Sequence, residues 1–443
     1  MDRPALNFSW PDRQQLPLLL IWSSLVVLPI GRVVEVSVML MAIAGIYLLF
    51  KHWRTWRHLP AFKLFATVFL LAWIPILVSL VDAVRPQSTA MISVNHLRFA
   101  FSGIFILHVL STPEAHRRFL TLCAWVLLFW VADGLVQMAA GRDLFGFAAP
   151  AGRINALFGQ KGLVYGTLVS VFSPLLWEYA ARHWSRWQVA AVVIATVIAV
   201  LASGARIAWI NIVVILLAYG VVLWRRRGRF PLALFAAALA AAIFTVGALW
   251  MGSERFASRV ESAVGAFTGS TPIMEDSIGH RLWIWRGAVN MIAANPLNGV
   301  GARGFRYAFP AYAAEGDPYI NADPPINPYH SHQLWLEILS ETGIVGALGL
   351  FVLLSLLLVA GIRAPASARR VMLPYALALL AAYFPFNTHM AIYSSFWSQI
   401  VWWLIALYCA AYGAGIKGMV NGDRQLNGDR SIFPVDGSRP PGK

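Results

Sequence analysis

Long apolar runs separated by short polar stretches dominate the chain. A helix needs roughly 17 to 25 mostly apolar residues to cross the hydrocarbon core of a membrane, and the pattern predicts about twelve such spans. The first two are separated only by Gly31-Arg32, so they could instead form a re-entrant pair. The predicted spans are 16–30, 33–50, 64–81, 97–110, 119–139, 162–180, 189–202, 207–224, 231–251, 344–361, 371–385 and 397–416.

One polar stretch, 252–332, is much longer than the others and lies between the ninth and tenth predicted spans. Long loops commonly carry function rather than merely connecting elements. Within it, apolar residues at helical spacing predict a helix over 277–294, which Pro296 ends. A glycine-rich turn over 298–304 follows, and the Tyr- and Pro-rich piece 307–329 is expected to be irregular.

This pattern divides the chain into four parts. Residues 1–251 form the first nine spans, 252–332 the large loop and 333–416 the last three spans. Residues 417–443 are rich in Gly, Pro, Asp and Arg and are expected to be a disordered cytoplasmic tail.

Composition agrees with a membrane protein. Hydrophobic residues make up 59% of the chain and charged residues only 12%, whereas soluble domains carry about 25% charged residues. The expected fold class is therefore an all-α polytopic membrane protein with a partly helical loop. The net charge of +15 does not indicate nucleic acid here, because basic loops in membrane proteins reflect orientation and contact with anionic lipid headgroups.

Basic residues concentrate in alternate short loops, which the positive-inside rule places in the cytoplasm together with both termini. The loop 252–332 then lies on the outer face. These basic residues are Lys51, Arg54, Arg57, Lys63, Arg117, Arg118, Arg182, Arg186, Arg225, Arg226, Arg227, Arg229, Arg363, Arg369 and Arg370.

Several cationic residues nevertheless fall on the predicted outer face. Arg206 ends a tight turn, Ser203-Gly204-Ala205-Arg206, between two apolar helices, and an arginine at such a boundary needs an anionic partner. The planar guanidinium suits phosphate, and the natural anion on the outer leaflet of a bacterial-type membrane is a lipid-linked pyrophosphate. The alternative is that these cations bind headgroups or loop carboxylates. The candidates are Arg206 and Arg281, with Arg286, Lys161, Arg153 and Arg303 as further substrate contacts.

Two histidines, His330 and His332, come just before a helix expected to begin near Gln333. Their spacing brings no carboxylate or cysteine to recognised metal-ligand positions, which disfavours a metal site. A neutral imidazole, with an ordinary pKa of about 6.5, can take a proton from a sugar hydroxyl. His389, near the outer end of the penultimate span, and Asp133, within the fifth span, are further polar candidates.

Four stretches together resemble the O-antigen ligase family, within the superfamily that also holds O-antigen polymerases. His332-Gln333 is followed after nine residues by Gly343 and then by Gly346, which is similar to the histidine motif ending the family's large periplasmic loop. The other stretches are Arg281-Leu282-Trp283, Asn295-Pro296-Leu297-Asn298-Gly299-Val300-Gly301 and the turn ending at Arg206.

The resemblance implies a GT-C-like enzyme of the bacterial inner membrane with its active site facing the periplasm. It implies inverting transfer of O-antigen from undecaprenyl pyrophosphate to lipid A–core oligosaccharide, with no metal, cofactor or nucleotide sugar. His332 matches the family's catalytic histidine, supported by His330 and Gln333. Arg206 and Arg281 would hold the diphosphate. Membrane lipids complete the expected partners, and no nucleic acid is among them.

Three alternatives remain at this point. An O-antigen polymerase would use the same donor and a second lipid-linked glycan as acceptor, and a protein O-oligosaccharyltransferase would modify protein. A transporter of anionic lipid or sugar is disfavoured, because the two halves lack corresponding spans broken by Gly or Pro.

Overall fold

The computed structural model describes residues 15–149, 153–159, 164–227, 280–385 and 391–430, with single residues 236, 240, 243 and 247. Regular structure in these ranges is helical. The elements are α1 (Leu16–Val26), η1 (Leu28–Val33), α2 (Val34–Trp56), α3 (Pro60–Val78), α4 (Pro86–Val109), α5 (Pro113–Ala140), η3 (Ala156–Phe158), α6 (Tyr165–His183), α7 (Arg186–Ala202), α8 (Arg206–Arg227), α12 (His280–Ala294), α13 (Phe305–Tyr312), α14 (Leu334–Arg363), α15 (Ala366–Ala382) and α16 (Ser395–Arg430).

The helices follow the predicted spans. Each predicted span coincides with a helix except 231–251, which lies outside the described residues apart from single positions. Seven described helices are long and apolar enough to cross a membrane: η1 with α2, α3, α4, α5, α8, α14 and α16. The chain is therefore a multi-pass membrane protein whose described elements are all helical. The number of about twelve spans remains a prediction.

Local sequence explains where the helices begin. Pro60, Pro86 and Pro113 open α3, α4 and α5, because proline's fixed φ and missing N–H suit the first turn of a helix. Ser185 and Gln188 form a reciprocal capping box at the start of α7, which satisfies two backbone N–H groups.

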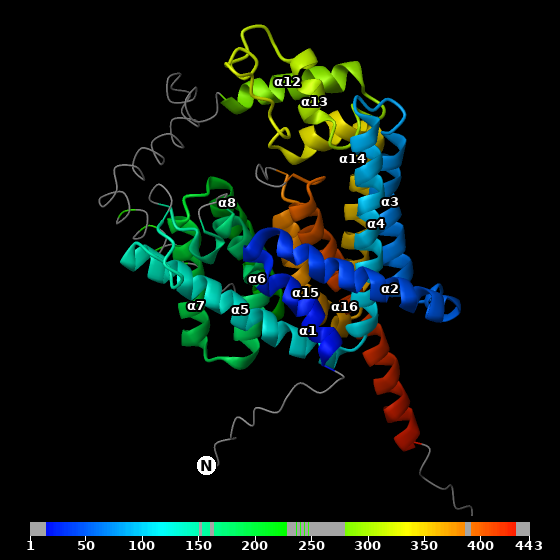
Figure 1. The fold of residues 1–443 in the computed structure, drawn as a ribbon. Coiled ribbons are helices and arrows are strands. Elements are labelled where there is room, and N and C mark those ends of the chain that lie inside the picture. Colours follow the sequence, from blue (N-terminus) through cyan, green and yellow to red (C-terminus); the bar gives the residue numbers. More distant parts are fainter. Residues whose placement is uncertain are drawn as a thin grey trace, which may run out of the picture.

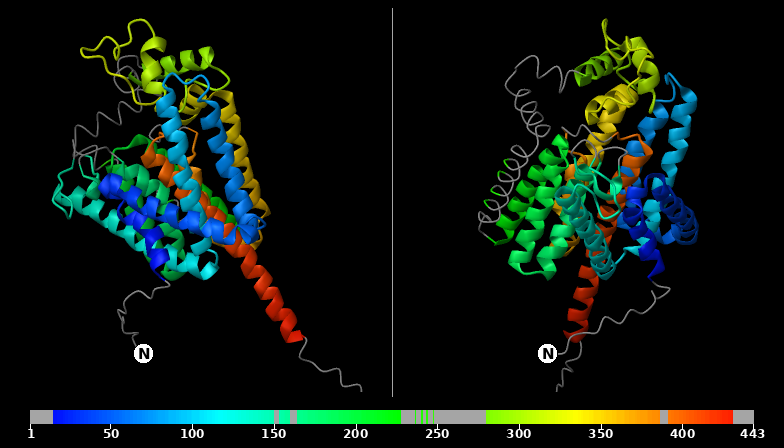
Figure 2. Two further views of the ribbon diagram at one scale, coloured as in Figure 1. Left: turned by 45° about the vertical axis from the view of Figure 1, so that its right-hand side comes forward. Right: turned by 60° about the vertical axis from the view of Figure 1, so that its left-hand side comes forward.

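The predicted basic loops lie at one end of the bundle. Arg182, at the end of α6, donates to the Arg370 carbonyl of α15 at 2.8 Å, so two of these loops are in contact. α12 and α13 form a cap over the opposite end, as Figures 1 and 2 show. The orientation of these two ends relative to the membrane remains a prediction.

The cap has a small apolar core of its own, in which α12 packs against α13. Its buried residues include Ile284, Ala288, Met291, Phe305 and Phe309. The helix predicted over 277–294 is confirmed for 280–294. The prediction that 307–329 is irregular was wrong at its start. Apolar residues of α13 at helical spacing pack on α12, and this burial outweighs the unfavourable proline inside the helix.

The glycine-rich turn after α12 fixes the direction of α14. The N–H of Val300 donates to the Ser340 carbonyl at 2.8 Å, and the N–H of Ile344 donates to the Pro296 carbonyl at 2.9 Å. α14 kinks where these bonds form, at Gly343, with φ 63° and ψ −161°, a conformation essentially confined to glycine. A side chain there would overlap the backbone of Leu297.

The C-terminal tail differs in part from the prediction. α16 continues to Arg430, so residues 417–430 are helical rather than disordered. Extending an existing helix avoids the unfavourable nucleation step, which explains how a polar, glycine-containing segment continues it. Residues 431–443 lie outside the described residues.

Candidate functional site

The two motif histidines lie together at the junction between the cap and the bundle. The ring centroids of His330 and His332 are 3.9 Å apart. His332 has a left-handed backbone with φ 54°, a conformation that histidine adopts more readily than most residues. Such backbones cluster at functional sites. Gln333 then caps α14 by accepting from the Leu336 N–H at 2.6 Å, as expected for a helix beginning near this residue.

α12 holds the histidine loop in place. The indole N–H of Trp285 donates to the carbonyl of Ser331, the residue between the two histidines, at 3.0 Å. The hydroxyl of Ser331, which is fully buried, donates to the Gln333 carbonyl at 2.9 Å. The loop is therefore fixed to both α12 and the start of α14.

Arg281 lies one helical turn before Trp285, so both residues are on the same face of α12. Burial lowers the pKa of Arg281, and the positive charge of Arg206 lowers it further. Arg206, the first residue of α8, is thus within electrostatic reach of Arg281. The hydroxyl of Tyr319 belongs to the same group: burial is the main cause of its raised pKa, and the charge of Arg281 opposes that rise.

Arg153 is the third cation of this group. Its side chain lies against Gly204, with Cγ 3.2 Å from where a Cβ would be, and Gly204 has a positive φ of 65°. Only glycine leaves space for this approach in that conformation. Burial and then the charge of Arg206 lower the pKa of Arg153. Its Nε has no hydrogen-bond partner among the described residues. We call Arg153, Arg206 and Arg281 the arginine cluster.

Two buried side chains of α5 hold the segment that carries Arg153. The Asp133 carboxylate accepts from the N–H groups of Leu144 and Leu157 at 2.9 and 2.8 Å. The Gln137 side-chain oxygen accepts from the N–H groups of Asn155 and Ala156 at 2.7 and 2.8 Å. These bonds give the intramembrane carboxylate predicted at Asp133 a structural task, which is to satisfy backbone donors of the outer loop.

The remaining expected contacts are Arg286, Arg303, Lys161 and His389. Arg286 is exposed and stacks over Trp283, 5.0 Å from the ring centroid, and helical geometry turns it by about 140° from Arg281. The backbone N–H of Arg303 donates to Glu341 of α14 at 2.7 Å. Lys161 and His389 lie outside the described residues.

Sequence reasoning missed several residues of the site. Trp285 and Tyr319 are the clearest, because indole and phenol side chains in a cap helix and loop carry no motif. Arg306 also went unassigned: it lies over the Tyr329 ring, 4.6 Å from its centroid, beside the histidine loop. Burial lowers the pKa of Arg306, and the charge of Arg303 adds to that effect.

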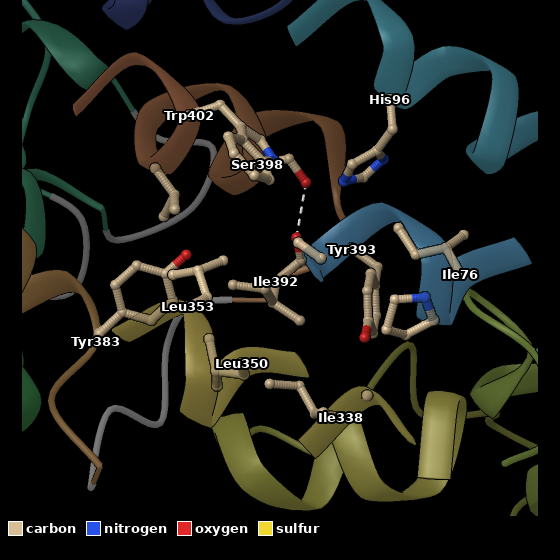
Figure 3. Close-up of a pocket in the computed structure, with 14 residues that line it drawn as sticks. Ile76, His96, Ile338, Leu350, Leu353, Tyr383, Ile392, Tyr393, Ser398 and Trp402 are labelled. Atoms are coloured by element: carbon tan, nitrogen blue, oxygen red, sulfur yellow. Dashed lines mark hydrogen bonds between the residues drawn. The ribbon is translucent and has the colours of Figure 1, made fainter. Parts of the chain in front are cut away.

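A cavity lies deeper in the bundle, between α3, α4, α14, α15 and α16 (Figure 3). Its lining is mostly apolar, with His96, Tyr393 and Ser398 as polar members, and Ser398 donates to the Ile392 carbonyl at 2.6 Å. A volume of about 40 Å³ suits water molecules and not a sugar ring.

The candidate site contains two kinds of functional group, guanidinium cations and imidazoles. The arginine cluster presents cations suited to a phosphate-bearing group, and the histidine loop presents imidazoles suited to proton transfer. No group of three or more His, Cys, Asp or Glu side chains within the described ranges is placed to hold a metal ion.

Part of the chain matches the model of a known protein family. A family model described as O-antigen ligase matches residues 190–351, a segment that includes Arg206, Arg281, His330 and His332 and leaves out Arg153. A search of curated proteins found no match to the chain. The family match supports membership in the O-antigen ligase superfamily.

Proposed function

We propose that this multi-pass membrane protein of the O-antigen ligase superfamily transfers O-antigen from undecaprenyl pyrophosphate to lipid A–core oligosaccharide. The reaction would take place on the periplasmic face of the bacterial inner membrane, at the junction between the cap and the bundle. The donor, the acceptor and this location are our proposal, and membership of the superfamily supports a glycosyltransferase of this type.

The proposed chemistry is a single displacement. His332 takes the proton of an acceptor hydroxyl, and the oxygen attacks the anomeric carbon of the donor sugar. The new bond forms as the bond from that carbon to the phosphate oxygen breaks, and undecaprenyl pyrophosphate leaves with the bonding electrons. Attack opposite the leaving group inverts the anomeric configuration. His330, with its ring against His332, supports the position of the base.

The arginine cluster would bind the diphosphate and stabilise the charge that develops as it leaves. Each well-placed donor to such charge contributes roughly 2.7 to 4 kcal/mol. Three guanidinium groups therefore supply a substantial part of the stabilisation that a metal ion gives in other transferases. We propose, as the family resemblance implies, that the reaction needs no metal.

One observation carries the proposal. Trp285 and Arg281 share a face of α12, Trp285 binds the histidine loop, and the charge of Arg281 interacts with that of Arg206. The link that α12 makes between the histidine loop and Arg281 supports a site in which a base and a phosphate-binding group act together, as transfer from a lipid-linked diphosphate requires.

The test is reconstituted transfer with purified protein and undecaprenyl-pyrophosphate glycan, offering three acceptors in parallel: lipid A–core, a second lipid-linked glycan and an acceptor protein. We expect product only on lipid A–core, and expect it to form in the presence of excess chelator. Product on the second glycan would identify a polymerase, and product on protein an oligosaccharyltransferase. Loss of activity on chelation would contradict the metal-free mechanism.

A further inference from the structure

A second cavity lies at the opposite end of the bundle from the arginine cluster. It has a volume of about 500 Å³, within the range of small-molecule and lipid sites, and lies where α2, α3, α4 and α16 meet. The loop between α2 and α3 forms part of its wall through Leu59, so the cavity is at the end that carries the basic loops. Neither the histidine motif nor the family resemblance involves these residues.

Along α4, the residues that line the cavity are polar near the end of the helix and apolar further into the bundle. His108 and Ser111 lie at the end of α4, whereas Ile104 lies one helical turn deeper. Ala410 of α16 likewise lies deeper than Ile416, because α16 runs toward this end. On the α4 side the lining therefore changes from polar to apolar with depth, while the α16 side is apolar throughout, an order that suits an amphiphile.

Aromatic and imidazole rings form the mouth. The ring of His52 stacks on Trp56 with centroids 5.0 Å apart, and the His108 ring lies 5.8 Å from His52 and 5.3 Å from Trp56. Imidazole N–H groups donate hydrogen bonds to phosphate oxygens, and tryptophan favours the headgroup region of membranes.

The surrounding charge is strongly positive. The segment 51–63 carries four basic residues and no acidic one, and the basic residues are all exposed: Lys51, Arg54, Arg57 and Lys63. The first turn of α5 contains a single acid, Glu114, which pairs with Arg117 at 2.6 Å. Basic residues near a membrane surface attract anionic lipids. This field favours an anionic headgroup over a zwitterionic one.

We propose that this cavity binds one phospholipid with an anionic headgroup. Its phosphate accepts hydrogen bonds from the ring edges of His52 and His108 and from the Ser111 hydroxyl, and one acyl chain follows the apolar wall formed by Leu107 and Ile104 of α4 and by α16. The site is separate from the proposed transfer reaction, and lipid binding here does not depend on the activity at the junction between the cap and the bundle.

Native mass spectrometry of the purified full chain tests the proposal, with phosphatidylglycerol and phosphatidylcholine as probes in separate titrations. We expect one tightly retained phosphatidylglycerol and about tenfold weaker retention of phosphatidylcholine, a difference of about 1.4 kcal/mol. The double variant His52→Gln/His108→Gln should lose this preference. His58→Gln is the matched control, because His58 is an exposed histidine of the same loop that contacts Arg57 and does not line the cavity.

A second variant fills the cavity and leaves both histidines in place. Leu107→Trp should reduce retention of both lipids about tenfold or more, with the thermal unfolding midpoint used to establish that the variant is folded. Equal retention of the two lipids by the wild type overturns the proposal. So does retention of phosphatidylglycerol at wild-type strength by the double variant or by Leu107→Trp.

Discussion

The charges of Arg206 and Arg281 interact, although one residue opens α8 in the bundle and the other lies in the first turn of α12 in the cap. Burial lowers the pKa of Arg281, and the charge of Arg206 lowers it further, because each positive charge disfavours the other. Burial and the charge of Arg206 also lower the pKa of Arg153. In the proposed function, this pair binds the diphosphate at the junction of cap and bundle.

Removing either charge of this pair should slow transfer strongly. Arg206→Gln and Arg281→Gln are each expected to lower kcat/KM by about 100-fold or more, because each removes a donor to the departing diphosphate. Arg286→Gln, on the same helix but turned away from Arg281, should have a much smaller effect. The measurement is initial rate against donor concentration. Comparable losses for Arg281→Gln and Arg286→Gln would place the phosphate site elsewhere.

The bond from Trp285 to Ser331 should matter through the position of the histidines. Trp285→Phe keeps most of the apolar packing and removes the indole donor, which typically costs about 0.5 to 1.5 kcal/mol. We expect kcat to fall by roughly tenfold with a nearly unchanged thermal unfolding midpoint. Unchanged kcat would show that the loop holds its position without this bond.

Asp133 offers a test between a structural and a chemical role. In Asp133→Asn, one of the two accepting oxygens becomes an NH₂ group facing a backbone N–H, so the loop carrying Arg153 should loosen. The expected result is a several-fold higher KM for the donor with kcat changed by less than about threefold. Near-total loss of kcat in a folded variant would instead give Asp133 a part in the chemistry.

Gly343 should be required for folding rather than for chemistry. Gly343→Ala places a side chain against the Leu297 backbone in a conformation that costs about 1 to 3 kcal/mol for other residues. We expect a clearly lower thermal unfolding midpoint and a lower yield of monodisperse protein. Gly316→Ala is the control, since Gly316 also has a positive φ, 80°, but no atom lies within 4 Å of its added Cβ. Equal effects of the two substitutions on the unfolding midpoint would show that the contact between the turn and α14 does not contribute specifically to stability.

The helices of the bundle were predictable because each contains a long apolar run, as a membrane-spanning helix requires, and such runs are visible in the sequence. The extent of α12 followed from helical spacing and Pro296. α13 was not predictable in the same way, because its stability comes from packing Phe305 and Phe309 against α12. The sequence alone did not explain why the motifs contain glycine. In the structure, Gly299 and Gly343 lie where the turn after α12 and the backbone of α14 are in direct contact, which leaves no space for a side chain.

The candidate site was predictable only in part. The sequence indicated His332, Arg206 and Arg281 individually, but they are far apart along the chain, and no local pattern shows that α12 connects them. Trp285 carries no motif, since its part depends on a hydrogen bond to a distant loop. The role of Asp133 depends likewise on bonds to Leu144 and Leu157, which only the folded loop brings to it.

In the proposed mechanism, His332 removes the proton of the acceptor hydroxyl as the glycan is transferred from the lipid-linked donor. The most direct measurement compares wild type, His332→Ala and His330→Ala in reconstituted transfer to lipid A–core, with the folded state of each variant established by thermal unfolding. We predict a loss of about 100-fold or more for His332→Ala and a smaller loss for His330→Ala, in line with the usual contribution of a general base. Wild-type rates for a folded His332→Ala variant would contradict the account.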